Sequence, residues 1–189
     1  IAPQVNEDWL MEMRRQNDAA MRRAREVISE AYRDFQAHFG RGGEPFIERY
    51  LMDDAEIALV GMGTLAMPVK VAVRKLRQQG HKVGFVRVRW FRPFPTVELQ
   101  QALAGVKAVG VIDRDYGFGS AFHSGVLANE LRAALYPLER RPRIVSLVAG
   151  LGGREVTGDN VIEIAGMVSS AGAGKAVDEQ ETYWIGVRE

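Results

Sequence analysis

Short apolar runs typical of β-strands alternate with amphipathic segments typical of α-helices over most of this chain. The expected strands are residues 57–60, 82–89, 106–112 and 143–148, and the expected helices are residues 68–79, 96–103, 122–135 and 160–168. Strictly alternating strands and helices favour a mostly parallel sheet with right-handed crossovers and helices on both faces. We therefore expect an α/β fold, specifically a three-layer α/β/α domain.

A long helix is expected ahead of this domain, over residues 6–39. Asn6 is a suitable cap for its first turn, and the glycines at 40, 42 and 43 suit its end. Its apolar positions recur every three or four residues: Met21, Ala24, Ile28, Ala31 and Phe35. One such stripe fits either a linker helix that lies across another domain or an ordinary surface helix.

These patterns divide the chain into three parts. Residues 1–50 are expected to form the long linker helix and a connection, and residues 51–169 the α/β domain. Residues 170–189 are expected to form a flexible linker and a docking tail, because glycine and alanine dominate 169–175 and bulky residues follow. Tyr183, Trp184 and Ile185 would otherwise leave an apolar cluster in water. The tail is therefore predicted to pack on a partner chain or on another domain.

Composition excludes several kinds of function. The net charge of +1 gives no reason to expect a nucleic-acid partner, and no apolar run is long enough for a membrane span. The chain has no cysteine, so it can form neither disulfides nor cysteine-ligated iron–sulfur clusters of its own. The three histidines lack the spacing of a metal site, so no metal ligands are predicted.

The segment 61–66 follows a strand and opens a helix with the pattern G-x-G-x-x-A. Gly61, Gly63 and Thr64 are therefore weak candidates for binding a cofactor phosphate, as in dinucleotide-binding folds. The next strand should then end in an acidic residue that holds the ribose. It ends in Arg87 and Arg89 instead, which leaves an NADP-binding module as the alternative function.

Three glycine-containing loops are expected at one edge of the sheet, at 61–64, 113–120 and 150–154. The carboxyl ends of parallel strands meet at one edge, where ligands or partners usually bind. Asp113 and Arg114 are expected to pair with neighbouring loop groups rather than to act in catalysis. Gly119 and Ser120 precede a helix whose start could accept an anion.

The run VRVRWFRPFP, residues 86–95, joins the end of a strand to two prolines. Proline prevents further strand pairing, and arginine and aromatic side chains are enriched in buried interfaces. The simpler interpretation is an arginine-capped strand end with a proline turn. The interface interpretation makes Arg89, Phe91, Arg92 and Phe94 candidates, together with Arg114, Tyr183 and Trp184.

Four stretches resemble one family in the same order along the chain. They are MDDAEIALVGMGTLA (52–66), VRVRWFRPFP (86–95), VGVIDRDYGFGS (109–120) and VAGLGGREVT (148–157). Together they resemble the transketolase C-terminal-like domain in the alpha subunits of 2-oxoacid:ferredoxin oxidoreductases, the pyruvate synthase group. Because the chain starts with Ile1 rather than Met, it is expected to be the C-terminal part of a longer subunit.

The resemblance implies oxidative decarboxylation of a 2-oxoacid, usually to an acyl-CoA, by a cytoplasmic complex that passes electrons to ferredoxin or a related acceptor. It implies thiamine diphosphate, Mg²⁺ and iron–sulfur clusters bound by other domains or subunits, and no catalytic residue here. The expected partners are the upstream thiamine diphosphate-binding domain, the beta subunit and the iron–sulfur gamma and delta subunits. A non-catalytic interaction protein is the remaining alternative.

Overall fold

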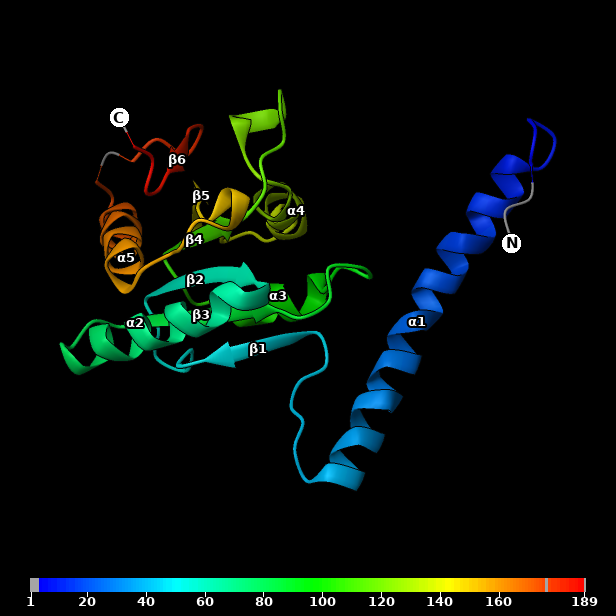
Figure 1. Cartoon of the computed structure of the whole chain (residues 1–189), viewed down its shortest axis with the longest axis horizontal. Coiled ribbons are helices and arrows are strands. Elements are labelled where there is room, and N and C mark those ends of the chain that lie inside the picture. The colour runs from blue at the N-terminus through cyan, green and yellow to red at the C-terminus, as the bar shows by residue number, and fades with distance from the viewer. Residues whose placement is uncertain (1–3, 176, 189) are drawn as a thin grey trace. The chain divides into compact units, whose positions relative to one another are not determined.

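A computed structural model describes residues 4–175 and 177–188 (Figure 1). Residue 1, where the expected linker segment starts, and residue 189, where the expected tail ends, lie outside the described residues. The chain forms two compact units. One unit comprises residues up to Pro45 together with Trp90–Pro95, and the other comprises Phe46–Arg89 and the chain from Thr96 onward.

The larger unit is built on a six-stranded sheet with the order β1-β3-β2-β4-β5-β6. Its strands are β1 Ile47–Tyr50, β2 Ile57–Met62, β3 Val83–Val88, β4 Ala108–Asp113, β5 Arg143–Val148 and β6 Thr182–Trp184. Only β1 is antiparallel among the pairs, and the remaining neighbours are parallel. The predicted mostly parallel sheet is confirmed, with β4 buried along its whole length at the centre.

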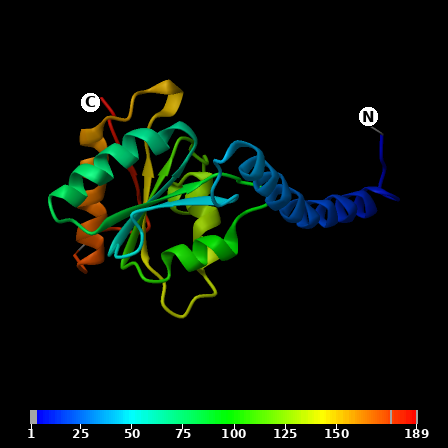
Figure 2. The same cartoon turned by 90° about the horizontal axis from the view of Figure 1, so that it is seen from below.

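Helices cover both faces of this sheet (Figure 2). They are α2 Ala66–Gln78, α3 Thr96–Leu103, α4 Val126–Leu135 and α5 Gly158–Gly172, with short 3-10 turns η1 Gly63–Leu65, η2 Ala121–His123 and η3 Leu151–Gly153. Helices α2 and α5 pack together on one face, and α3 packs with α4 on the other. The three-layer α/β/α prediction is therefore confirmed.

Two strands fall where the sequence predicted connections. Strand β1 pairs with β3, which puts Ile47–Tyr50 in the sheet rather than in the linker segment. Strand β6 pairs with β5, so Tyr183 and Trp184 are sheet residues of this domain instead of a tail extended toward a partner. Both are edge strands of three or four residues, too short to show a period in the sequence.

The boundaries of two helices also differ from those expected. Helix α5 continues to Gly172, through residues expected to form the flexible linker. It starts with a capping box in which the Thr157 hydroxyl accepts from the Asn160 amide at 3.2 Å. Helix α4 starts at Val126 rather than at 122, because Phe122 and His123 have positive φ angles of 60° and 48°, which a right-handed helix excludes.

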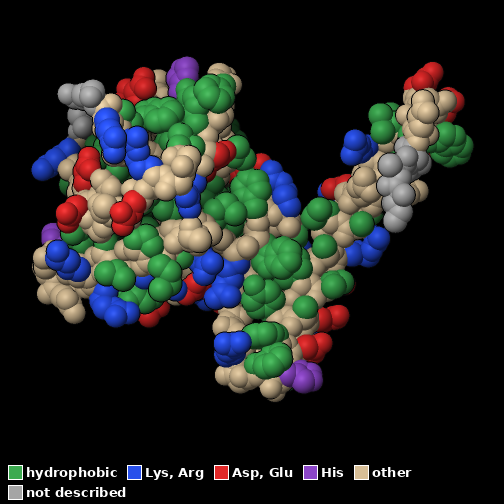
Figure 3. Space-filling model, in the orientation of Figure 1, with side chains coloured by type: hydrophobic (Ala, Val, Ile, Leu, Met, Phe, Trp, Pro, Cys, Tyr) green, Lys and Arg blue, Asp and Glu red, His purple; other side chains and the backbone are tan. Residues whose placement is uncertain are grey.

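The smaller unit contains helix α1, Leu10–Phe39. Gly40 ends it in the left-handed conformation, as predicted, and donates to the Gln36 carbonyl at 2.9 Å. Asn6 does not cap it with its side chain; its backbone carbonyl accepts from Leu10 at 3.1 Å. Figure 3 shows hydrophobic side chains along α1, and Phe35 and Phe39 are among the exposed ones.

None of the helices in the described part of the chain combines the length and apolar character needed to cross a bilayer.

Candidate functional site at the carboxyl edge of the sheet

Arg114 ties together the loops that follow three parallel strands. Its guanidinium donates to the Thr64 hydroxyl after β2 at 2.7 Å and to the Gly150 carbonyl after β5 at two distances of 3.3 Å. Arg114 itself directly follows β4. The three glycine-containing loops therefore lie at one edge of the sheet, as predicted, and Arg114 pairs with neighbouring loop groups.

These contacts bear on the weak cofactor candidates. Gly61 lies inside β2, and Gly63 opens the turn η1 with φ +67°. The Thr64 hydroxyl already accepts from Arg114. The segment is thus hydrogen-bonded to the domain's own loops, which leaves the Thr64 hydroxyl engaged within the domain.

Asp113 ends β4 and faces the start of α4. It is 4% exposed, and its two carboxylate oxygens accept from the backbone amides of Leu127 at 3.1 Å and Ala128 at 3.0 Å. Asp115 accepts from the Val126 amide at 3.2 Å. The sequence suggested that the start of this helix could accept an anion. In the structure, the start of α4 binds two carboxyl groups of the chain itself.

The surroundings of Asp113 change its acidity. Burial, and next the neighbouring Asp115 carboxyl, raise the pKa of Asp113 to about 7, against the opposing effect of the two backbone amides. Desolvation and a nearby like charge both disfavour the ionised form of a carboxyl group. Asp113 is therefore a carboxyl group that changes charge near neutral pH.

This shift predicts a pH dependence of stability. Between pH about 4, the ordinary pKa of an aspartate, and pH about 7, the folded chain keeps a proton that the unfolded chain has lost. The free energy of unfolding should therefore fall as pH rises through this window, by up to about 4 kcal/mol. Denaturant unfolding at pH 4.5, 5.5, 6.5 and 7.5 measures it.

The variant Asp115→Asn should make this fall smaller, because it removes the like charge and keeps an oxygen that accepts from Val126, while burial of Asp113 remains. Asp159→Asn, in the first turn of α5, is the matched control and should leave the slope unchanged. A free energy of unfolding that instead rises with pH would show that the amides of α4 dominate and that Asp113 is ionised.

Around the end of β3, three cations surround one carboxylate. Glu48 on β1 forms an ion pair with Lys70 on α2, and Arg87 and Arg89 each lie 3.7 Å from its other oxygen. Burial raises the pKa of Glu48, but Lys70 and then the two arginines outweigh burial and hold that pKa below its ordinary value. Arg89 thus has a partner inside the domain.

The segment Trp90–Pro95 belongs to the smaller unit. Phe91 and Phe94 pack edge to face with ring centroids 5.7 Å apart. The Arg92 guanidinium lies 4.3 Å from the Phe91 ring centroid and donates to the Phe91 carbonyl at 3.0 Å. The Phe94 carbonyl accepts from Arg25 on α1 at 3.5 Å. The proline-containing end of the run 86–95 therefore has its own aromatic packing.

An aromatic cluster lies beside the loop after β4. Tyr116 contacts Phe118 and Trp184, with centroid distances of 5.0 and 4.9 Å. Phe118 is 92% exposed, whereas Trp184 is about half exposed. Tyr183 packs against the core, and its hydroxyl accepts from the Asp178 amide. Sequence reasoning missed Tyr116 and Phe118, although both lie in the glycine-containing loop that it singled out.

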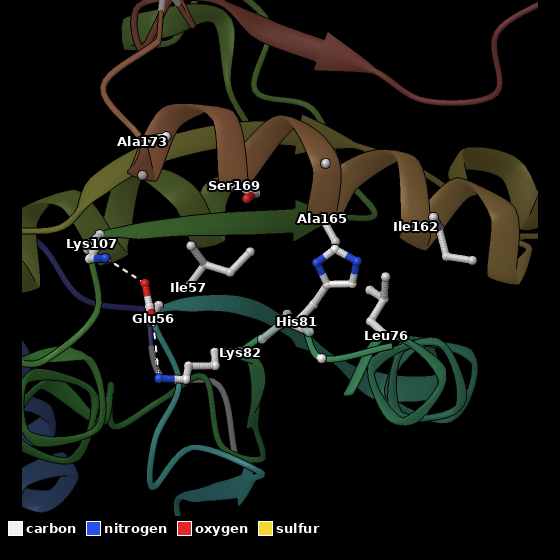
Figure 4. A pocket seen from close by; sticks show the side chains of 14 residues that line it. Glu56, Ile57, Leu76, His81, Lys82, Lys107, Ile162, Ala165, Ser169 and Ala173 are labelled. Carbon is white, nitrogen blue, oxygen red and sulfur yellow. Dashed lines mark hydrogen bonds and ion pairs between the residues drawn. The ribbon is translucent and has the colours of Figure 1, made fainter. Parts of the chain in front are cut away.

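The opposite edge of the sheet has a cavity of about 520 Å³ (Figure 4). There Glu56 forms ion pairs with Lys107 at 2.5 Å and with Lys82 at 3.5 Å. The His81 side chain points toward α5. Across the described residues, no three histidine, cysteine, aspartate or glutamate side chains gather as metal ligands.

The chain matches one family over most of its sheet domain. The family described as "Pyruvate:ferredoxin oxidoreductase core domain II" matches residues 55–161. Ketoisovalerate oxidoreductase subunit VorA of Pyrococcus abyssi is 42% identical over 163 residues, covering 86% of this chain and 40% of that subunit. Pyruvate synthase subunit PorA of Thermotoga maritima is 35% identical over 182 residues, covering 96% and 44%.

Solved structures agree on the fold. A 2-oxoglutarate:ferredoxin oxidoreductase from Magnetococcus marinus superposes with a TM-score of 0.50 at 18% identity, covering 87% of this chain and 24% of that one. A split-gene transketolase gives 0.53 at 16%, covering 69% and 44%. This chain spans less than half the length of the curated relatives named above. On the match over residues 55–161, it belongs to the pyruvate:ferredoxin oxidoreductase core domain II family.

Proposed function

We propose that this chain is the C-terminal part of the alpha subunit of a 2-oxoacid oxidoreductase that depends on thiamine diphosphate and iron–sulfur clusters. The complete enzyme would oxidatively decarboxylate a 2-oxoacid in the cytoplasm, usually to an acyl-CoA, and reduce ferredoxin or a related acceptor. The names and the coverage of the relatives support this proposal.

In this proposal the chain has a structural role at an interface. The observation that carries this proposal is a contrast between the polar and the aromatic side chains at the carboxyl edge of the sheet. Arg114 and Asp113 direct their polar atoms to the domain's own loops and to α4, whereas the Phe118 ring stands 92% exposed. Exposed aromatic side chains on a rigid support are typical anchors of protein interfaces.

The partners proposed are the upstream thiamine diphosphate-binding domain, the beta subunit and the iron–sulfur gamma and delta subunits. Arg89, Arg92 and Phe94 are the further interface residues proposed, with α1 as the link toward the upstream domain. Arginine suits this role because its guanidinium can bind a carboxylate with two parallel hydrogen bonds.

The described residues do not fit a site for thiamine diphosphate. Its diphosphate is usually held through Mg²⁺, which needs one or two carboxylates. The carboxyl groups at the carboxyl edge, Asp113 and Asp115, accept from amides at the start of α4. We therefore assign no step of the reaction to a residue of this chain and place the cofactors on the proposed partners.

The test uses the complete enzyme complex carrying Phe118→Ala. Loss of an interface anchor should weaken subunit association about tenfold, measured by sedimentation, while dye reduction with a panel of 2-oxoacids per intact complex stays unchanged. Met67→Ala, at an apolar residue of α2 that is 69% exposed, is the control. Unchanged association, or dye reduction by this chain alone, would contradict the interface role.

A further inference from the structure

A second cavity, of about 620 Å³, lies beside α4 and away from the carboxyl-edge loops tied by Arg114. Its walls come from α4, from the connection between α4 and β5, and from the segment before β6. The lining includes Phe122, Arg132, Tyr136, Arg141, Arg143 and Glu179. This volume is within the range of small-molecule sites, which combine an apolar lining with a few polar groups.

Arg143 is fully engaged in this wall. It donates to the Glu179 carboxylate at 2.5 Å, and to the carbonyls of Ala171, Lys175 and Val177 at 3.0–3.1 Å. Glu179 also accepts from the Ile144 amide at 3.2 Å. These contacts hold the wall in place and engage the Glu179 carboxylate with Arg143, while Glu179 and Asp113 attract Arg132 at longer range.

Among the described residues, the hydrogen bonds of Arg132 and Arg141 go to uncharged oxygens. Arg132 donates to the Ser124 hydroxyl at 3.3 Å and to the Glu179 backbone carbonyl at 3.2 Å. Arg141 donates to the Tyr136 carbonyl at 3.2 Å. Within residues 4–175 and 177–188, neither guanidinium forms an ion pair with a carboxylate within 4.0 Å.

The cavity therefore has an excess of positive charge. Among the lining residues, three guanidinium groups stand against the Glu179 carboxylate, and the end of α4 adds a partial charge of about −0.5. The balance is roughly +1.5. An anion that enters such a site is attracted by the positive charge and also accepts hydrogen bonds from N–H groups. A planar guanidinium group can bind a carboxylate with two parallel hydrogen bonds.

Two aromatic rings line the same cavity, each with an arginine above it. The Arg132 guanidinium lies 4.5 Å from the Phe122 ring centroid, and that of Arg141 lies 5.2 Å from the Tyr136 centroid. Leu135, Pro142 and Ile144 add apolar surface. A bare inorganic anion would use the charges but leave this apolar surface unused.

We propose that this cavity binds a small organic anion in which a carboxylate is attached to a flat apolar body. The carboxylate accepts hydrogen bonds from Arg141, within the attraction of Arg132, and the flat body packs on Tyr136 and the apolar wall.

Three probes distinguish the contribution of the carboxylate from the contribution of the aromatic ring. Benzoate carries both the carboxylate and the ring, acetate only the carboxylate, and benzamide only the ring with an uncharged amide. Titrations of the full chain at constant ionic strength, followed by NMR chemical shifts, should give a Kd on the order of 1 mM for benzoate. Acetate and benzamide should each bind about tenfold or more weakly, because each loses one class of contact.

Variants then locate the site. Arg141→Gln and Tyr136→Ser, both at exposed residues, should each weaken benzoate binding about fivefold or more. Arg140→Gln is the matched control, because Arg140 is exposed, adjacent in sequence and absent from the cavity lining. Circular dichroism checks that each variant is folded.

Equal affinity for acetate and benzoate would overturn the proposal in favour of unspecific anion pairing. Equal affinity for benzamide would overturn it in favour of apolar contact alone, and undetectable benzoate binding would overturn it outright. If Arg140→Gln weakened binding as much as Arg141→Gln, the site would not be this cavity.

Discussion

Replacing Gly125 with alanine should lower the free energy of unfolding by about 3 kcal/mol. A Cβ at this position would lie 2.3 Å from Cγ of Asp113 and 2.5 Å from its Oδ2. Asp113 cannot move aside easily, because it is buried and accepts from the amides of Leu127 and Ala128. The added methyl group must therefore break these bonds or displace α4. Denaturant unfolding of the two proteins measures the difference.

Gly166→Ala is the matched control for this substitution. Gly166 lies inside α5, and a Cβ there would meet nothing within 4 Å. Alanine is the better helix former by about 1 kcal/mol, so this variant should be as stable as the parent or more stable. Equal stability of the Gly125→Ala variant and the parent would show that α4 shifts without cost and that its contact with Asp113 is loose.

Deleting the chain after Gly174 should destabilise the sheet domain itself by about 4 kcal/mol or more. The sequence alone predicts a docking tail for this segment, but in the structure it contributes strand β6 to the sheet. Ile185 is 7% exposed, and its amide donates to the Val148 carbonyl at 2.9 Å. The deletion also removes Glu179, the partner of Arg143, and leaves the edge of β5 unpaired.

The variant Trp184→Ala distinguishes the destabilisation caused by losing β6 from the loss of side-chain packing at the aromatic cluster. Trp184 is about half exposed, so its truncation should cost less than about 1.5 kcal/mol. Unfolding of the truncated chain at the same denaturant concentration as the parent would contradict a structural role for β6. A broad transition without cooperativity would support that role as strongly as a shifted midpoint.

The sequence predicts the central elements of the fold well, because these segments are long enough to show a clear hydrophobic pattern. Helix α3 and strand β5 have the expected bounds, Thr96–Leu103 and Arg143–Val148. Strand β1 was missed because Glu48 and Arg49 fill its middle, and its place depends on pairing with β3, more than thirty residues away. Strand β6 is three residues long, so only its pairing with β5 defines it.

The candidate site was predictable in its position but not in its contacts. Strand–loop–helix order is enough to place three loops at one edge. The partners of Arg114 lie 50 and 36 residues away in the sequence, so no local pattern reveals them. Burial of Asp113 depends on where α4 starts, and that start was misplaced because positive φ angles at Phe122 and His123 are unusual for these residue types.

The single guanidinium shared by three loops has a consequence for how this edge moves. Gly63 and Gly150 adopt left-handed φ angles of 67° and 77°, and loops of this kind are ordinarily the freest part of a domain. With Arg114 bound to Thr64 and to Gly150, each loop can change conformation only if it breaks a hydrogen bond to another. The edge is thus pre-organised, and in the proposed interface role its association would lose less conformational entropy than it would with independent loops.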